Sequence, residues 1–165
     1  MDGAALLAEL RARFGSDVVE THEHRGDHTA VVTREGLLRV LAWCRDEPSL
    51  AFEMLTDLTA VDYVKYPGRQ DGPRFEVVYH LYSLTHNHRL RLKVRVDEDD
   101  ALVPTAVDLW PIADWFEREV WDMFGVRFAG HPDLRRLLMY EEFVGHPLRK
   151  DYPIDRRQPL IGPAT

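Results

Sequence analysis

The chain has 165 residues, of which 45% are hydrophobic and 30% charged, values that exclude a fibrous repeat or a wholly disordered chain and predict one folded domain. Its formal net charge of -7 disfavours a nucleic-acid-binding surface. A single cysteine supplies neither an intrachain disulfide nor the ligands of an iron-sulfur cluster, so we expect a reducing compartment. No apolar run reaches the ~18 residues of a membrane-spanning helix, so we expect a soluble, unexported chain.

The first 32 residues predict one helix and two short strands. Apolar residues recur at helical spacing over residues 4–14, and Gly15 is a suitable stop. Residues 18–20 and 29–32 are typical of strands, and we interpret the polar stretch 22–28 between them as a loop.

A second helix is indicated after these strands. Thr33 is a candidate N-cap, Leu37, Leu41 and Cys44 share one face at helical spacing, and Pro48 lies beyond the end. Cys44 is therefore expected in the core rather than as a reactive thiol.

The middle of the chain predicts three longer strands. Residues 52–64 alternate in polarity, and a turn-rich loop, 66–74, separates them from strands at 75–83 and 89–96. In the last strand every even position is apolar and every odd position from 89 to 95 is Arg or Lys. One of its faces is therefore apolar and the other cationic.

Residues 111–124, which follow an acidic turn and a Pro-containing edge segment, have helical character and end at Gly125. Strands framed by helices predict an α+β fold in which helices pack on a largely antiparallel sheet as a two-layer sandwich. We assign residues 1–140 to this domain. Residues 141–165 are rich in proline and lack apolar periodicity, so we expect an extended C-terminal arm that docks on a partner.

The histidines suggest a metal site only weakly. His22, His24 and His28 cluster in the sequence, as do His86 and His88, but a zinc site needs three or four ligands and no HExxH or cysteine pattern accompanies them. We expect solvated loop histidines and no metal ligand. The chain also lacks nucleotide-binding loops and a nucleophile elbow, so no catalytic or cofactor-binding residue is predicted.

The helix at 111–124 carries an unusual combination of side chains. Three aromatic residues, Trp115, Phe116 and Trp121, accompany the charged residues 117–119 and 122. One small core is not expected to bury all three aromatic side chains. Part of this surface is therefore expected to contact another protein.

Three sequence blocks resemble a known family. They are FEVVYHLYSLTHNHRLRLKV (75–94), EREVWDMFGVRFAGHPDLRRLLM (117–139) and GHPLRKDYP (145–153). In this order they resemble the C subunit, also called the 30 kDa subunit family, of respiratory complex I, the proton-translocating NADH:quinone oxidoreductase. The resemblance extends over residues 50–155.

The resemblance implies a non-catalytic peripheral subunit at the cytoplasmic face of the bacterial inner membrane, attached to the membrane only through the complex. Its expected partners are the large quinone-cavity subunit (D type) and the neighbouring iron-sulfur subunits. FMN and iron-sulfur clusters are expected on those partners, which carry electrons from NADH to quinone. Equivalent subunits of membrane-bound hydrogenases or of ferredoxin- or F420-dependent dehydrogenases stay open, as do an unrelated protein-binding adaptor and a small metal-dependent enzyme.

The candidate site is therefore a subunit interface rather than a catalytic centre. Its residues come from the charged helix and from the two blocks rich in Arg, His and Pro that follow it. They are Glu117, Arg118, Glu119, Asp122, His131, Arg135, Arg136, His146, Arg149, Lys150, Asp151 and Tyr152.

Overall fold

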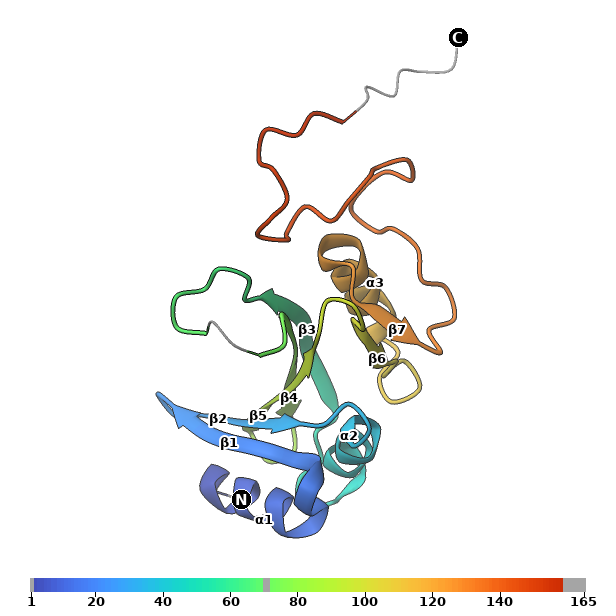
Figure 1. Ribbon diagram of the computed structural model, residues 1–165. Helices are drawn as coiled ribbons and strands as arrows, with labels where there is room; N and C mark the ends of the chain where they lie inside the picture. The colour runs from blue at the N-terminus through green and yellow to red at the C-terminus, as the bar shows by residue number, and fades with distance from the viewer. Residues whose placement is uncertain (1, 70–71, 159–165) are drawn as a thin grey trace.

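The computed structural model describes residues 2–69 and 72–158. In this part of the chain, helices pack against a five-stranded sheet, and a short two-stranded ladder lies beside it (Figure 1). The helices are α1 (Gly3–Phe14), α2 (Leu37–Asp46) and α3 (Ala113–Phe124), and a 3-10 turn, η1 (Gly15–Asp17), follows α1. The strands are β1 (Val18–His24), β2 (Asp27–Val32), β3 (Met54–Asp62), β4 (Phe75–Ser83), β5 (His88–Val96), β6 (Leu102–Pro104) and β7 (Arg127–Ala129).

The larger sheet has the strand order β1-β2-β5-β4-β3. Its neighbours pair antiparallel except β2 and β5, which are parallel, so the predicted α+β fold with a largely antiparallel sheet is confirmed. Strands β6 and β7 also pair parallel, and α3 is the crossover that such a pair requires. Strand β7 has no counterpart in the sequence-based prediction.

One face of the large sheet forms the core together with the helices. Leu90, Leu92 and Val94 of β5 belong to a single buried cluster that includes residues of α1, α2 and α3. The opposite face carries the basic side chains of β5, and the salt bridges of Lys93 and Arg95 lie there. The predicted division of β5 into an apolar and a cationic face is confirmed.

The predicted loop at 22–28 is wrong, because these residues continue β1 and β2 into a hairpin. The turn is formed by Arg25 (φ 53°) and Gly26 (φ 84°), two successive positive φ angles of the kind that tight hairpins use. Polar side chains are tolerated because β1 is an edge strand. The backbone pairing, which composition does not reveal, decides the structure here.

Two further expectations need adjustment. The second helix begins at Leu37 rather than directly after Thr33, whose hydroxyl instead accepts a hydrogen bond from the Gly36 N–H at 3.1 Å. In β3 the register shifts between Leu55 and Asp57, so the simple alternation predicted for 52–64 is interrupted.

Beyond β7, the described chain has neither helix nor strand, and we call residues 131–158 the C-terminal segment. It runs past α3 and ends away from the sheet (Figure 1). The predicted arm, 141–165, makes up the second part of this segment as far as residue 158, and its last seven residues lie outside the described part of the chain.

Candidate subunit interface

Helix α3 divides the predicted interface residues between its faces. Glu117 and Asp122 are completely buried, Arg118 is 8% exposed, and Glu119 is exposed to solvent. Trp115 is 55% exposed, so part of the aromatic surface does face outward as the sequence indicated. Buried carboxyl groups need hydrogen-bond donors, and the structure supplies a separate set of donors to each.

Asp122 fastens the C-terminal segment to α3. One carboxylate oxygen accepts the backbone N–H groups of Leu137, Leu138 and Met139 at 3.0, 2.8 and 2.9 Å. The other oxygen accepts from Arg136 Nη1 at 2.6 Å. Burial raises the pKa of Asp122, but these donors outweigh it and hold the pKa below its ordinary value, so the group is a carboxylate.

The three arginines beside α3 differ in role. Arg118 donates to the backbone carbonyls of Arg135 and Arg136, at 3.3 and 3.2 Å, and lies over the Trp115 ring. Arg136 also donates to the carbonyls of Phe143 and Gly145, which bends the segment back on itself. Arg135 is exposed and pairs with Asp133 in its own loop.

Glu117 lies in a different environment. One of its oxygens accepts the Ala106 N–H at 2.6 Å, the other lies 2.5 Å from Thr105 Oγ1, and His131 Nε2 is 4.0 Å away. The His131 side chain is itself fully buried. Burial raises the pKa of Glu117 to about 7 despite the hydrogen bonds from Ala106 and Thr105.

A second buried carboxylate, Asp62 at the end of β3, holds the following part of the segment. It accepts Arg74 Nη2 at 2.8 Å and the Lys150 N–H at 2.9 Å. Arg74 bridges further to Asp151 and to Glu98, both at 2.7 Å. The predicted residues Lys150 and Asp151 are thus anchored to the sheet, although both are exposed.

His146 and Arg149 dock against the end of α3. His146 Nδ1 lies 3.0 Å from the Asp122 carbonyl, and Arg149 Nε donates to the Phe124 carbonyl at 2.6 Å. Gly125 makes this approach possible, because it has φ 79° and a Cβ at this position would lie 2.6 Å from the Arg149 guanidinium. The glycine predicted as a helix stop therefore also provides the space for the segment.

The outer side of the C-terminal segment is rich in exposed apolar side chains. Tyr152, the last predicted interface residue, stacks on Phe143 at 6.0 Å and is half-buried. Around these anchors, large apolar side chains face solvent at Leu138 (57% exposed), Val144 (58%), Leu148 (50%) and Ile154. Hydrogen bonds fix the inner side of the segment, and its apolar side is left uncovered.

The sequence analysis missed the partners that these residues use inside the chain. Asp62, Arg74 and Thr105 lie far from their contacts in the sequence, and no local spacing marks them. The antiparallel register of β3 and β4, which pairs Asp62 with Phe75, is what brings Arg74 to Asp62. Only a correct prediction of the pairing between β3 and β4 could therefore have revealed the contact of Asp62 with Arg74.

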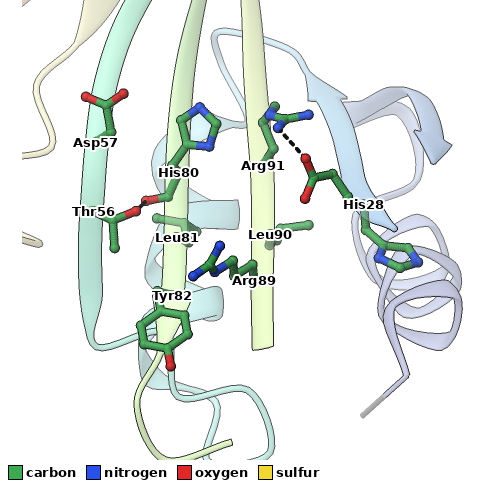
Figure 2. A pocket seen from close by; sticks show the side chains of 10 residues that line it. His28, Thr56, Asp57, His80, Leu81, Tyr82, Arg89, Leu90 and Arg91 are labelled. Atoms are coloured by element: carbon green, nitrogen blue, oxygen red, sulfur yellow. Dashed lines mark hydrogen bonds and ion pairs between the residues drawn. The ribbon is translucent and has the colours of Figure 1, made fainter. Parts of the chain in front are cut away.

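A hollow on the open face of the large sheet is the other candidate (Figure 2). His80 and Arg91 point into it from β4 and β5, and Arg91 pairs with Asp27 at 2.9 Å. Burial, followed by the charge of Arg91, lowers the pKa of His80. The charge of Arg91 is matched by Asp27, and the lowered pKa favours a neutral His80, so these two side chains offer no net charge to a ligand.

The histidines differ in exposure: His24 and His86 are exposed as predicted, whereas His22, His28 and His88 are half-buried in strands. His86 and His88 reach the backbone carbonyls of Pro48 and Leu50 at 2.9 and 2.8 Å, and His88 stacks on Phe52. His86 is exposed in the turn between β4 and β5, as predicted, whereas His88 belongs to β5 and is half-buried, so the prediction of a loop residue is wrong for His88. Among the described residues, no three His, Cys, Asp or Glu side chains gather as a potential metal site, and no helix is long and apolar enough to cross a membrane.

Sequence comparisons relate the chain to a family of subunits of a respiratory enzyme. The family model described as the 30 Kd subunit of respiratory-chain NADH dehydrogenase matches residues 30–158. The chain is 50% identical over 151 residues to the C subunit of NADH-quinone oxidoreductase from Burkholderia multivorans, covering 90% of this chain and 76% of the relative. It is 45% identical over 150 residues to the protein of the same name from Acidithiobacillus ferrooxidans, covering 90% and 74%.

Two solved structures have similar folds. The trypsin-resistant fragment (1-134) of Nqo5 superposes with a TM-score of 0.71 at 35% identity, covering 81% of this chain and all of that one. A chain of the membrane-bound sulfane sulfur reductase, an archaeal respiratory membrane complex, gives 0.70 at 25% identity, covering 93% and 87%.

The chain therefore belongs to the 30 kDa subunit family of the respiratory-chain NADH dehydrogenase. It is a subunit of a multisubunit oxidoreductase of the NADH-quinone oxidoreductase type. The resemblance expected from the sequence is confirmed, and an unrelated adaptor is ruled out.

Proposed function

We propose that this chain is a non-catalytic subunit of the peripheral arm of a proton-translocating NADH:quinone oxidoreductase, and that it supports assembly by docking its C-terminal segment on a neighbouring subunit. Electrons pass from NADH through FMN and iron-sulfur centres on the partner subunits to quinone. The chain lies at the cytoplasmic face of the inner membrane and reaches the membrane only through the complex.

The observation that carries this proposal is the two-sided character of the C-terminal segment. Its inner side is held by Asp122 and Asp62, and its outer side exposes Leu138, Val144 and Leu148. A segment that is already ordered loses less conformational entropy on binding, so its apolar side chains contribute more net affinity. Its preferred partner is the large quinone-cavity subunit, with the iron-sulfur subunits beside it.

One solved relative supports this division between body and segment. That Nqo5 structure is a trypsin-resistant fragment, and it covers 81% of the present chain. A stably folded body resists protease, so this resistance supports the proposal that the sheet and helices form a stable platform for the segment.

Substitution of one exposed apolar residue tests the docking surface. Val144→Asp places a charge in the proposed interface and is expected to weaken association by about 1–3 kcal/mol, roughly ten- to a hundredfold, measured as the amount of this chain retained with the complex in mild detergent. Val19→Asp is the matched control, because Val19 is also 58% exposed but lies on β1, away from the segment. Equal retention of both variants would contradict the proposal.

A second candidate is the equivalent subunit of a related complex with another electron donor. The similarity to a chain of the sulfane sulfur reductase complex, with a TM-score of 0.70, favours it. Stoichiometric recovery of flavin and iron-sulfur subunits together with NADH-dependent quinone reduction supports the first candidate. Activity with reduced ferredoxin but not with NADH supports the second.

A further inference from the structure

Glu117 is a buried carboxyl group that forms no ion pair with an Arg or Lys of the described residues. Its hydrogen bonds come from the Ala106 N–H and the Thr105 hydroxyl, both of which are neutral. The neighbouring Arg118 points instead to the backbone carbonyls of residues 135 and 136. An ionised carboxylate in this position would be costly, because neutral donors replace only part of its lost hydration.

His131 does not provide the missing charge. Its Nδ1 accepts the Asp133 N–H at 3.0 Å, which requires an unprotonated nitrogen at that position. Its Nε2 therefore carries the hydrogen and faces the carbonyl and carboxylate oxygens of Asp114, both at 3.2 Å. The ring therefore directs its N–H to Asp114 and lies 4.0 Å from Glu117, without a hydrogen bond to it.

The other titratable groups around Glu117 also favour its neutral form. Asp114, one turn earlier on α3, adds negative charge, which raises the pKa of Glu117 further. Tyr79 of β4 is fully buried, and its hydroxyl makes no hydrogen bond within the described residues. The groups that act on the Glu117 carboxyl are thus neutral hydrogen-bond donors and the negative Asp114.

We propose that Glu117 is a proton-binding site beneath His131, the first residue of the C-terminal segment, and that its protonation controls how the start of this segment packs on α3. The carboxyl group takes up one proton from solvent when His131 and the turn at Thr105 pack over it, and releases that proton to solvent when this packing opens. The site belongs to this chain alone, so it does not depend on the identity of the partner on which the segment docks.

The sign of the pH dependence follows from the direction of the shift. The ordinary pKa of 4.5 applies to the open state and a value of about 7 to the closed state, so the closed state binds more protons between them. The closed state therefore loses stability as pH rises through this window, by up to about tenfold in its equilibrium constant per pH unit. Below this window the packing is fully retained.

A direct titration of the full-length chain tests the proposal. The side-chain carboxyl carbon of Glu117, followed by NMR in glutamate-labelled protein and assigned by its absence in Glu117→Gln, is expected to titrate near pH 7. The wild-type titration decides the question even where the variant folds poorly. A midpoint at or below 4.5 would overturn the proposal.

Proteolysis measures the consequence for the segment. Arg135 is an exposed trypsin site that lies four residues after His131. From pH 6 to 8.5, cleavage after Arg135 is expected to increase by up to about tenfold more in wild type than in Glu117→Gln, whose amide preserves the two hydrogen bonds without ionising. Glu119→Gln, on the exposed face of α3, should behave as wild type. Parallel pH profiles for wild type and Glu117→Gln would show that the proton does not control this packing.

Discussion

Removal of the Asp122 carboxylate should detach the C-terminal segment from α3 while leaving the sheet intact. Asp122→Ala leaves Arg136 without its carboxylate and removes the common acceptor of three backbone N–H groups. Removing one partner of a buried ion pair costs about 3–5 kcal/mol. The four bonds do not add, because once the segment has opened no further stability can be lost there.

A graded series separates the two halves of this site. Asp122→Asn keeps one oxygen for the three N–H groups but turns an amide N–H toward Arg136, so it should lose about 1.5–3 kcal/mol, the contribution of one hydrogen bond to a charged group. Asp133→Asn is the control, since the pair that Asp133 forms with Arg135 is exposed and is expected to contribute less than 1 kcal/mol.

Hydrogen exchange of the backbone amides provides the assay. In Asp122→Ala the amides of Leu137, Leu138 and Met139 should exchange roughly a hundredfold faster or more, since each 1.4 kcal/mol is a factor of about ten. The amides of β4 and β5 should exchange as in wild type. Unchanged protection of the three segment amides would refute the view that Asp122 holds the segment.

Three other outcomes follow from the same contacts. Glu76 is 2% exposed and bound by Arg95 and Lys93, which lower its pKa to about 2 against the effect of burial, so acid unfolding of wild type below pH 4.5 should be steeper than that of Glu76→Gln. Gly125→Ala should cost at least about 1 kcal/mol in urea denaturation, because it combines a positive φ with a clash against Arg149; an unchanged midpoint would contradict this. Deletion of residues 145–165 removes the hydrogen bond from Lys150 to Asp62 and the ion pair of Asp151 with Arg74. The thermal midpoint should therefore fall by a few degrees, while circular dichroism should still show the folded sheet.

The regular part of the fold could be predicted because its signals are local. Strand β5 alternates apolar and basic residues without interruption, and α3 ends at the glycine that the sequence marks as its stop. Where the signal was composition alone, the prediction failed. The polar stretch 22–28 became a hairpin because the backbone of β1 pairs with that of β2 across it.

The site could be predicted only as a region. The run from Glu117 to Asp122 marks α3 as unusual, but nothing local tells a buried carboxyl group from an exposed one. The difference between Glu117 and Glu119 arises from the rotation of the helix against β3 and β7. No short sequence motif reveals such packing between distant residues, and the ion pair of Asp62 with Arg74 is a second example.

The two buried acids of α3 take opposite protonation states, and together they limit the pH range in which the C-terminal segment is held. Asp122 has a guanidinium and three N–H donors, so its contribution is present above its ordinary pKa of 3.8 and is lost as pH falls below it. Glu117 has only neutral donors, so the packing over it weakens as pH rises from 4.5 through about 7. The segment is therefore held most firmly in mildly acidic solution. Between pH 4.5 and about 7 the hold on the segment therefore changes most steeply with pH.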